Sequence, residues 1–154
     1  MSMGRNGNDE RGAAAAPAPA FDPAAAGWTI RDDEPGLITV VGPMWQFGSG
    51  DGIRLGFVAR PDHANRRGVL HGGMTMTFAD QVLGVVAIEA TPGKQLATVQ
   101  LDTHFVDAVG TGEFVEGHAR IVRRTRSMLF MSGVIHVGDR VVATANGIWK
   151  VLGA

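Results

Sequence analysis

The sequence predicts an α+β domain in which an antiparallel sheet wraps around one long buried helix. Residues 74–90 are apolar on nearly every side, which is typical of a buried helix rather than an amphipathic surface helix. After residue 96 the chain alternates polar and apolar side chains, as strands do, and Gly138-Asp139 between the last two alternating runs is a hairpin signal. A helix that is apolar all round needs cover on several sides, and a curled antiparallel sheet supplies most of it.

Two short apolar runs precede this helix. Residues 36–42 and 52–60 are bounded by glycine and proline, so we expect a strand in each. Residues 61–70 contain turn formers without periodicity and predict a loop. Pro92-Gly93 ends the helix.

The rest of the chain predicts an antiparallel meander, which gives a sheet of about five to six strands. Strict alternation in its first strand places Thr98 on the opposite face from Val99 and Leu101. Thr98 can reach Asp80 in one of three ways: the strand carries a bulge, a neighbouring subunit contributes one of the two residues, or the polar residues of this strand face inward. The expected strands are 97–106, 113–124, 127–137 and 140–152.

Composition limits the class of protein. The chain has 154 residues, 45% hydrophobic, with a formal net charge of -1, which gives no reason to expect a nucleic acid or an anionic membrane as partner. It has no cysteine, which excludes disulfides, thiol chemistry and cysteine-bound zinc. The histidines are too dispersed to predict a metal site.

The first 27 residues differ in composition from the rest. They are rich in alanine, proline and glycine and contain one aromatic residue, so we expect residues 1–27 to form a disordered tail and 28–154 to form the domain. An "APA" in this segment resembles a signal-peptide cleavage site, but no apolar stretch of seven or more residues precedes it. We therefore expect a cytoplasmic protein.

The stretch "NRRGVLHGGMTMTFAD" (65–80) places two glycines at the start of the helix and one carboxylate within it. Gly72 and Gly73 stand where backbone N–H groups of the first helical turn lack partners, and the helix dipole there favours negative charge. Such an end is suited to hold the oxyanion that forms when water attacks a carbonyl group, with Gly72 as the expected donor. Alternatively, the glycines only permit a tight turn from loop to helix.

Asp80 is unexpected within an apolar helix. It shares its helical face with Met76, Thr77, Leu83 and Gly84, none of which is cationic. A buried carboxylate without a counter-charge is more basic than a solvated one, which suits removal of a proton from water. The alternative is an Asp near the rim of the sheet that accepts bonds from backbone donors.

The order of elements together with "N-x5-HGG-x7-D" and the threonine of "LATVQLD" resembles the hotdog-fold acyl-CoA thioesterases, specifically the phenylacetyl-CoA thioesterase (PaaI-like) group. The likeness spans roughly residues 36–152. It implies a hotdog fold, Asp80 as general base or nucleophile, and Thr98 as a residue that holds the attacking water. It also implies that Gly72 N–H and Asn65 contact the thioester oxygen. His71 belongs to the motif, where it either orients Asn65 or the loop or lies near the leaving thiolate.

The same resemblance implies an assembly of identical chains. In hotdog proteins two protomers join their sheets and the active site lies at the seam, so Asp80 and Thr98 are expected to come from different chains of a homodimer, which can pair again into a tetramer.

A basic cluster in the turn near residue 125 is a candidate for holding the phosphates of coenzyme A, or else is a solvated hairpin tip. Its members are Arg123, Arg124, Arg126 and Ser127. Many relatives have a glycine near this turn, and Thr125 departs from that pattern.

The sequence therefore predicts an acyl-CoA thioesterase that uses water and no cofactor, with an acyl-CoA ester as its small-molecule partner. Two other functions stay open. A hotdog hydratase or dehydratase usually pairs an Asp with a His about five residues later, and position 85 here is Val. A non-catalytic acyl-CoA sensor generally carries a DNA-binding domain, and the 27-residue tail is too short for one.

Overall fold

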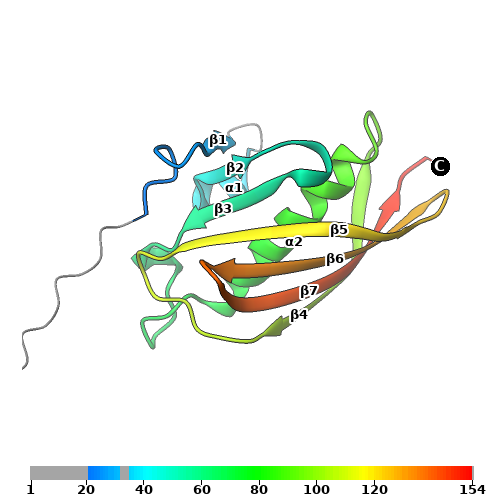
Figure 1. Ribbon diagram of the computed structural model, residues 1–154. Helices are drawn as coiled ribbons and strands as arrows, with labels where there is room; N and C mark the ends of the chain where they lie inside the picture. The colour runs from blue at the N-terminus through cyan, green and yellow to red at the C-terminus, as the bar shows by residue number, and fades with distance from the viewer. Residues whose placement is uncertain (1–20, 32–34, 154) are drawn as a thin grey trace, which may run out of the picture.

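The computed structural model describes residues 21–31 and 35–153, so most of the predicted tail lies outside the described residues. Seven strands form one antiparallel sheet in the order β1-β2-β3-β5-β6-β7-β4. The sheet curls around the long helix α2 (Figure 1). The strands are β1 (Thr29–Arg31), β2 (Met44–Phe47), β3 (Arg54–Val58), β4 (Leu96–Phe105), β5 (Phe114–Arg124), β6 (Met128–Val137) and β7 (Arg140–Val151), and the helices are α1 (Leu37–Val41) and α2 (Gly72–Glu89), with short 3-10 turns η1 (Gly50–Gly52) and η2 (Pro61–His63).

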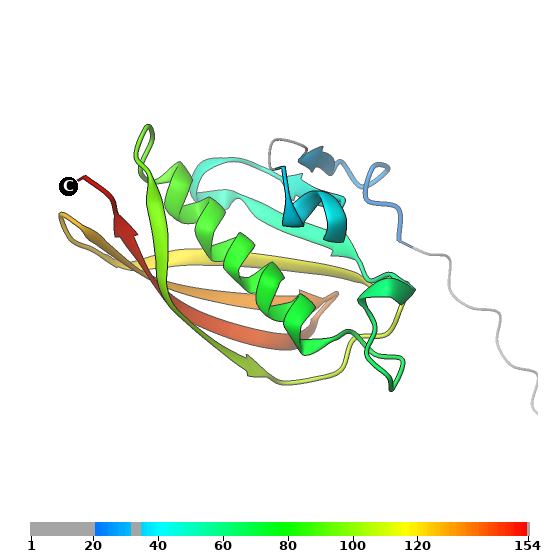
Figure 2. The same ribbon diagram turned by 180° about the vertical axis from the view of Figure 1, so that it is seen from behind.

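Helix α2 lies across the concave face of the sheet, with α1 beside it (Figure 2). Phe78, Val82 and Leu83 on α2 are almost fully buried, and they belong to one core cluster with side chains of β2, β3, β5, β6 and β7. The partly buried Leu96 and Leu101 of β4 pack against this cluster. The predicted buried helix and the antiparallel meander after it are confirmed. Burial of this apolar area is the main stabilising term of the fold.

One stripe of α2 is nevertheless left uncovered. Gly73, Met76, Asp80, Gly84 and Ile88, spaced three or four residues apart, are exposed or half-buried, whereas their neighbours on the helix are mostly buried. Residues at this spacing share one face of a helix. The curled sheet therefore leaves an open seam along α2, and Asp80 lies in the middle of it.

Two glycines allow α2 to lie close to the sheet. A Cβ atom at Gly117 on β5 would lie 2.8 Å from Val82 Cγ2, and one at Gly133 on β6 would lie 2.6 Å from Leu83 Cδ1. Separations this short are clashes rather than contacts, so a side chain at either position requires the neighbouring side chains of α2 to shift.

The N-terminal part of the fold differs from the prediction. Residues 36–42, expected as a strand, contain the short helix α1, and the strands β1 and β2 raise the count from the expected five or six to seven. The Arg60 guanidinium donates hydrogen bonds to the carbonyl oxygens of Val40 and Gly42 at the end of α1. These long-range bonds satisfy carbonyls that a short helix leaves open, so the tertiary context overrides the β-branched composition.

Strand β4 carries a bulge that reverses the predicted alternation. Thr98 pairs with Trp149 on β7 and Gln100 pairs with Ile148, so Val99 is an extra residue in the strand. After this bulge, Thr98 and Leu101 lie on the same face of the sheet, toward α2. Of the three explanations considered for Thr98, the bulge is the correct one.

Candidate active site

Asp80 and Thr98 meet within one chain. The Thr98 hydroxyl donates a hydrogen bond of 3.0 Å to Asp80 Oδ1. The expectation that this pair comes from two different chains is therefore wrong, because the bulge at Val99 turns Thr98 toward the helix of its own chain. The bond holds one carboxylate oxygen in place and leaves the other open to the seam.

The pair faces a cavity of about 420 Å³. Helix α2 supplies one wall, β4 and β7 supply another, and β1 supplies Arg31. The lining residues are Arg31, Asp80, Gln81, Gly84, Val85, Ile88, Leu96, Thr98 and Trp149.

Two members of this lining, Arg31 and Trp149, were not predicted as site residues. Arg31 lies on β1, a strand that was not expected, and it donates a hydrogen bond of 2.8 Å to Gln46 Oε1 on β2. Trp149 was expected only as part of a strand. The strand register pairs it with Thr98, which shows that its side chain lies on the same face of the sheet as Thr98. A cation therefore does line the cavity of Asp80, although it comes from a different element and not from the helix.

At the start of α2 the two glycines have different surroundings. His71 is the N-cap, and its Nδ1 accepts a hydrogen bond of 2.9 Å from the N–H of Gly73. The N–H of Gly72 makes no hydrogen bond with any of the described residues. Of the two, Gly72 is therefore the donor that remains available to a ligand, and His71 has a capping role that the motif alone did not reveal.

Asn65 shapes the loop that leads to this helix end. Its Oδ1 accepts a hydrogen bond of 2.8 Å from the N–H of Arg67, and its own N–H donates to the carbonyl of Val69 at 2.8 Å. The side-chain oxygen is thus used within the turn, which leaves the amide NH₂ as the group that Asn65 can offer to a ligand oxygen.

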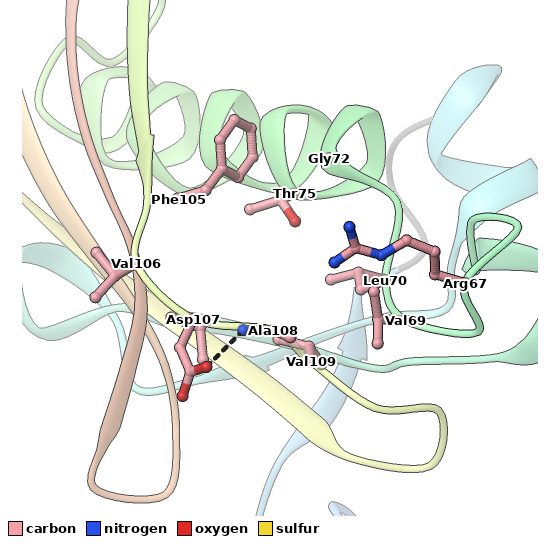
Figure 3. A pocket seen from close by; sticks show the side chains of 11 residues that line it. Arg67, Val69, Leu70, Gly72, Thr75, Phe105, Val106, Asp107, Ala108 and Val109 are labelled. Carbon is pink, nitrogen blue, oxygen red and sulfur yellow. Dashed lines mark hydrogen bonds between the residues drawn. The ribbon is translucent and has the colours of Figure 1, made fainter.

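A second cavity, of about 410 Å³, opens at this end of α2. Figure 3 shows the Arg67 side chain reaching into it below Gly72 and Thr75, with Phe105 and Val106 on the opposite side. Asp107 lies at its margin and is bonded to the N–H of Ala108 and to Arg140, which together hold the pKa of this carboxyl below its usual range.

The basic hairpin lies at the other end of α2. Arg124 donates a hydrogen bond of 2.7 Å to the carbonyl of Ala90, which follows the last residue of the helix. Thr125 closes the turn, because its hydroxyl accepts a bond of 3.0 Å from the N–H of Met128. Arg123 and Arg126 are exposed and Ser127 is half-buried. Arg124 therefore has a structural task at the helix end, where the dipole favours a cation.

The predicted site residues thus fall into two groups on one chain. Gly72 and Asp80 are eight positions apart on the same helix, which separates them by about 12 Å along its axis. Each faces its own cavity. A single thioester carbon cannot contact both groups of one chain. Among the described residues, no cluster of three or more His, Asp or Glu side chains is arranged to hold a metal ion.

A curled antiparallel sheet around one long helix, with a threonine-bonded aspartate in the open seam, defines an α+β protein with a carboxylate site. Residues 67–146 match the family model of the thioesterase superfamily. An inferred esterase from Pseudomonas aeruginosa is 35% identical over 90 residues, which cover 58% of this chain and 67% of that protein.

Solved structures share the fold of this chain. A conserved protein of Pseudomonas aeruginosa superposes with a TM-score of 0.73 at 25% identity, covering 77% of this chain and 95% of that one. The phenylacetic acid degradation protein PaaI of Thermus thermophilus gives a TM-score of 0.68 at 19% identity, covering 75% and 97%. A hypothetical thioesterase protein of Streptococcus pneumoniae, solved with coenzyme A, gives a TM-score of 0.67 at 23% identity, covering 71% of this chain and 86% of that one.

The chain belongs to the thioesterase superfamily and has the hotdog fold. As a member of this superfamily it is a thioester hydrolase. In the part of the chain that the structure describes, no helix has the length and apolar character needed to cross a membrane.

Proposed function

We propose that this protein hydrolyses acyl-CoA thioesters, with water activated by Asp80. The observation that carries the proposal is the hydrogen bond from Thr98 to Asp80 at the wall of a cavity in the open seam. The coenzyme A in the Streptococcus pneumoniae neighbour supports coenzyme A as the thiol part of the substrate. The reaction as proposed uses water and needs no cofactor.

In this reaction Asp80 takes a proton from water as the water oxygen attacks the thioester carbon. Thr98 orients the carboxylate and leaves its second oxygen for the water. The carbonyl oxygen gains negative charge, which the N–H of Gly72 and the amide of Asn65 stabilise from a second copy of the chain. When the C–S bond breaks, coenzyme A leaves with the proton that Asp80 held, and the acid is released.

The proposed assembly is a homodimer, because the two groups of one chain lie too far apart to act together. A two-fold dimer that places the Gly72 end of one helix beside Asp80 of the other completes two sites at once. Strand β4 is an edge of the sheet and pairs only with β7 among the described strands. Its free edge and the parts of the uncovered stripe of α2 outside the Asp80 cavity are the surfaces we expect a second copy to cover.

The deciding experiment measures thiol release from a panel of aryl- and fatty-acyl-CoA esters. We expect Asp80→Asn to lower kcat by about 10²-fold or more, because Asn has nearly the same shape but cannot accept the proton. Glu89→Gln removes an exposed carboxylate from the end of the same helix and is the matched control, with kcat unchanged. A wild-type protein that binds coenzyme A esters but releases no thiol from any of them would favour the sensor function instead.

A further inference from the structure

Trp149 places a hydrogen-bond donor in the cavity that Asp80 lines. The residue as a whole is 3% exposed, and its Nε1 makes no hydrogen bond with any residue that the structure describes. This nitrogen is not among the fully buried side-chain atoms without a partner, so it is open to the cavity. An indole N–H is normally paired with the protein, with water or with a ligand, and here the protein supplies no acceptor. An unpartnered donor in the wall of a cavity therefore points to a ligand that supplies the acceptor.

Gly84 keeps this donor uncovered. A Cβ atom at Gly84 would have Trp149 Nε1 as its nearest neighbour, at 3.7 Å, so the N–H edge of the indole faces the gap where a side chain would be. Glycine in the middle of a helix is unfavourable compared with alanine. Both residues line the cavity, so the missing side chain opens the space into which the indole N–H points.

The donor stands beside the proposed catalytic pair. Gly84 is one helical turn after Asp80, and Trp149 is the register partner of Thr98 across β4 and β7. Two charged side chains line this cavity, Asp80 and Arg31. The indole N–H is an uncharged donor, and the Asp80 carboxylate lies one helical turn from the Gly84 gap, which suits an uncharged acceptor there better than an anion.

We propose that Trp149 Nε1–H donates a hydrogen bond to an uncharged oxygen of the bound thioester, in the space that Gly84 leaves open. Two parts of an acyl-CoA carry such an oxygen: the amide carbonyls of the pantetheine arm, and the acyl group. Trp149 is then a substrate-binding residue that favours an oxygen-bearing ligand. This inference rests on the proposed function only in taking an acyl-CoA as the ligand.

The test follows the indole N–H directly by NMR. The chain has three tryptophans, so its ¹H–¹⁵N spectrum holds three indole signals, and Trp149→Phe identifies the one in the cavity. Coenzyme A and its S-phenacyl thioether, which cannot be hydrolysed, are the probes. We expect the Trp149 signal to move downfield on binding. A move with coenzyme A alone assigns the acceptor to the pantetheine arm, whereas a move with the thioether only assigns it to the acyl part.

Two variants test the same bond by affinity for the thioether, measured by calorimetry. Loss of one uncharged hydrogen bond weakens binding by about three- to tenfold, and we expect this from both Trp149→Phe and Gly84→Ala. The alanine Cβ makes an ordinary contact at 3.7 Å, and alanine favours a helix, so Gly84→Ala should melt no lower than wild type. Trp28→Phe, at a buried tryptophan outside the cavity lining, is the control with unchanged affinity.

An indole signal that does not move, or affinities of both variants equal to wild type, would overturn the assignment. Because the thioether is not hydrolysed, these readouts do not depend on turnover. A protein whose Trp149 signal moves but which releases no thiol from acyl-CoA esters would contradict the proposed hydrolysis and leave the role of Trp149 standing.

Discussion

The hydroxyl of Thr98 has one identified task, the bond to Asp80. Thr98→Val keeps the shape of the side chain and removes the donor, so the carboxylate loses one orienting contact. A hydrogen bond to a charged group contributes about 1.5 kcal/mol or more, and we expect kcat to fall about tenfold with KM little changed.

Thr103 offers a matched control for this substitution. It lies on the same strand and the same face of the sheet, and its buried Oγ1 has no hydrogen-bond partner. Thr103→Val should leave kcat at the wild-type value, as measured by thiol release. Equal losses from both substitutions would indicate damage to β4 rather than loss of the bond to Asp80.

His63 makes stability depend on pH. Burial lowers the pKa of His63 below its ordinary value of 6.5, the charge of Arg60 adds to this, and Asp62 and the Val41 backbone oppose it. Below about pH 6.5 the unfolded chain therefore binds a proton that the folded chain does not. The free energy of unfolding should decrease as the pH falls from 6.5 toward the folded pKa.

Urea unfolding at pH 7.5 and 5.5 checks this for the wild type and for His63→Gln, which does not titrate. We expect the wild type to lose more stability than the variant between these two values. Parallel losses would show that other groups cause the pH dependence.

Individual site residues were predictable where they break a local rule. Asp80 and Gly72 stand out because a carboxylate and a glycine are unfavourable in an apolar helix, and that cost marks them as candidates. Arg31 and Trp149 break no rule in a strand. Their place in the cavity depends on how β1 and β7 curl around α2, which local sequence does not encode.

At the scale of elements, the packing of α2 on the sheet depends on the small residues beneath it. A Cβ atom at Gly133 would lie 2.6 Å from Leu83 Cδ1 and 3.1 Å from the backbone oxygen of His118. The backbone cannot give way as a side-chain end can, so we expect Gly133→Ala to lower the free energy of unfolding by about 1–3 kcal/mol.

The control for this prediction is Gly52→Ala, because a Cβ atom there meets nothing within 4 Å. Denaturant unfolding of both variants gives the comparison. If Gly133→Ala is as stable as Gly52→Ala, the helix does not rest against the sheet as closely as its geometry indicates.

The long elements were predictable and the short ones were not. Helix α2 and strands β3 to β7 follow clear periodic patterns, and their observed bounds lie within about two residues of the expected ones. Helix α1 has only five residues, and bonds from Arg60 far along the chain stabilise it. The sequence did not predict the bulge in β4 directly. It showed only that strict alternation would turn Thr98 away from Asp80, and the pairing of β4 with β7 explains how the bulge removes this conflict.

At the scale of the whole molecule, the seam along α2 separates two incomplete sites. The helix places Gly72 about 12 Å from Asp80, and no hydrogen bond or cavity among the described residues joins them. In the proposed homodimer, each site takes Gly72 from one chain and Asp80 from the other. A chain that lacks the Gly72 function and a chain that lacks Asp80 can therefore still form one intact site between them. This expectation can be tested by combining two inactive variants.

Gly72→Pro is suited to remove the oxyanion donor without other change. Proline is favoured at the first position of a helix, and the preceding His71 has the extended backbone that a following proline requires, with φ -68 and ψ 135. Gly72→Ala keeps the N–H and serves as the control. We expect the proline variant alone to lose about 10²-fold in kcat, as comparable oxyanion donors do, and the alanine variant to retain far more.

Gly72→Pro and Asp80→Asn, refolded together at equal concentrations, should recover activity. Random pairing makes half of the dimers mixed, and each mixed dimer holds one site with both intact halves and one with neither, so about a quarter of the wild-type activity returns. Separately refolded samples, mixed without exchange of subunits, give the baseline. A co-refolded mixture that stays at this baseline, while a dimer forms, would contradict a site built from Gly72 of one chain and Asp80 of the other.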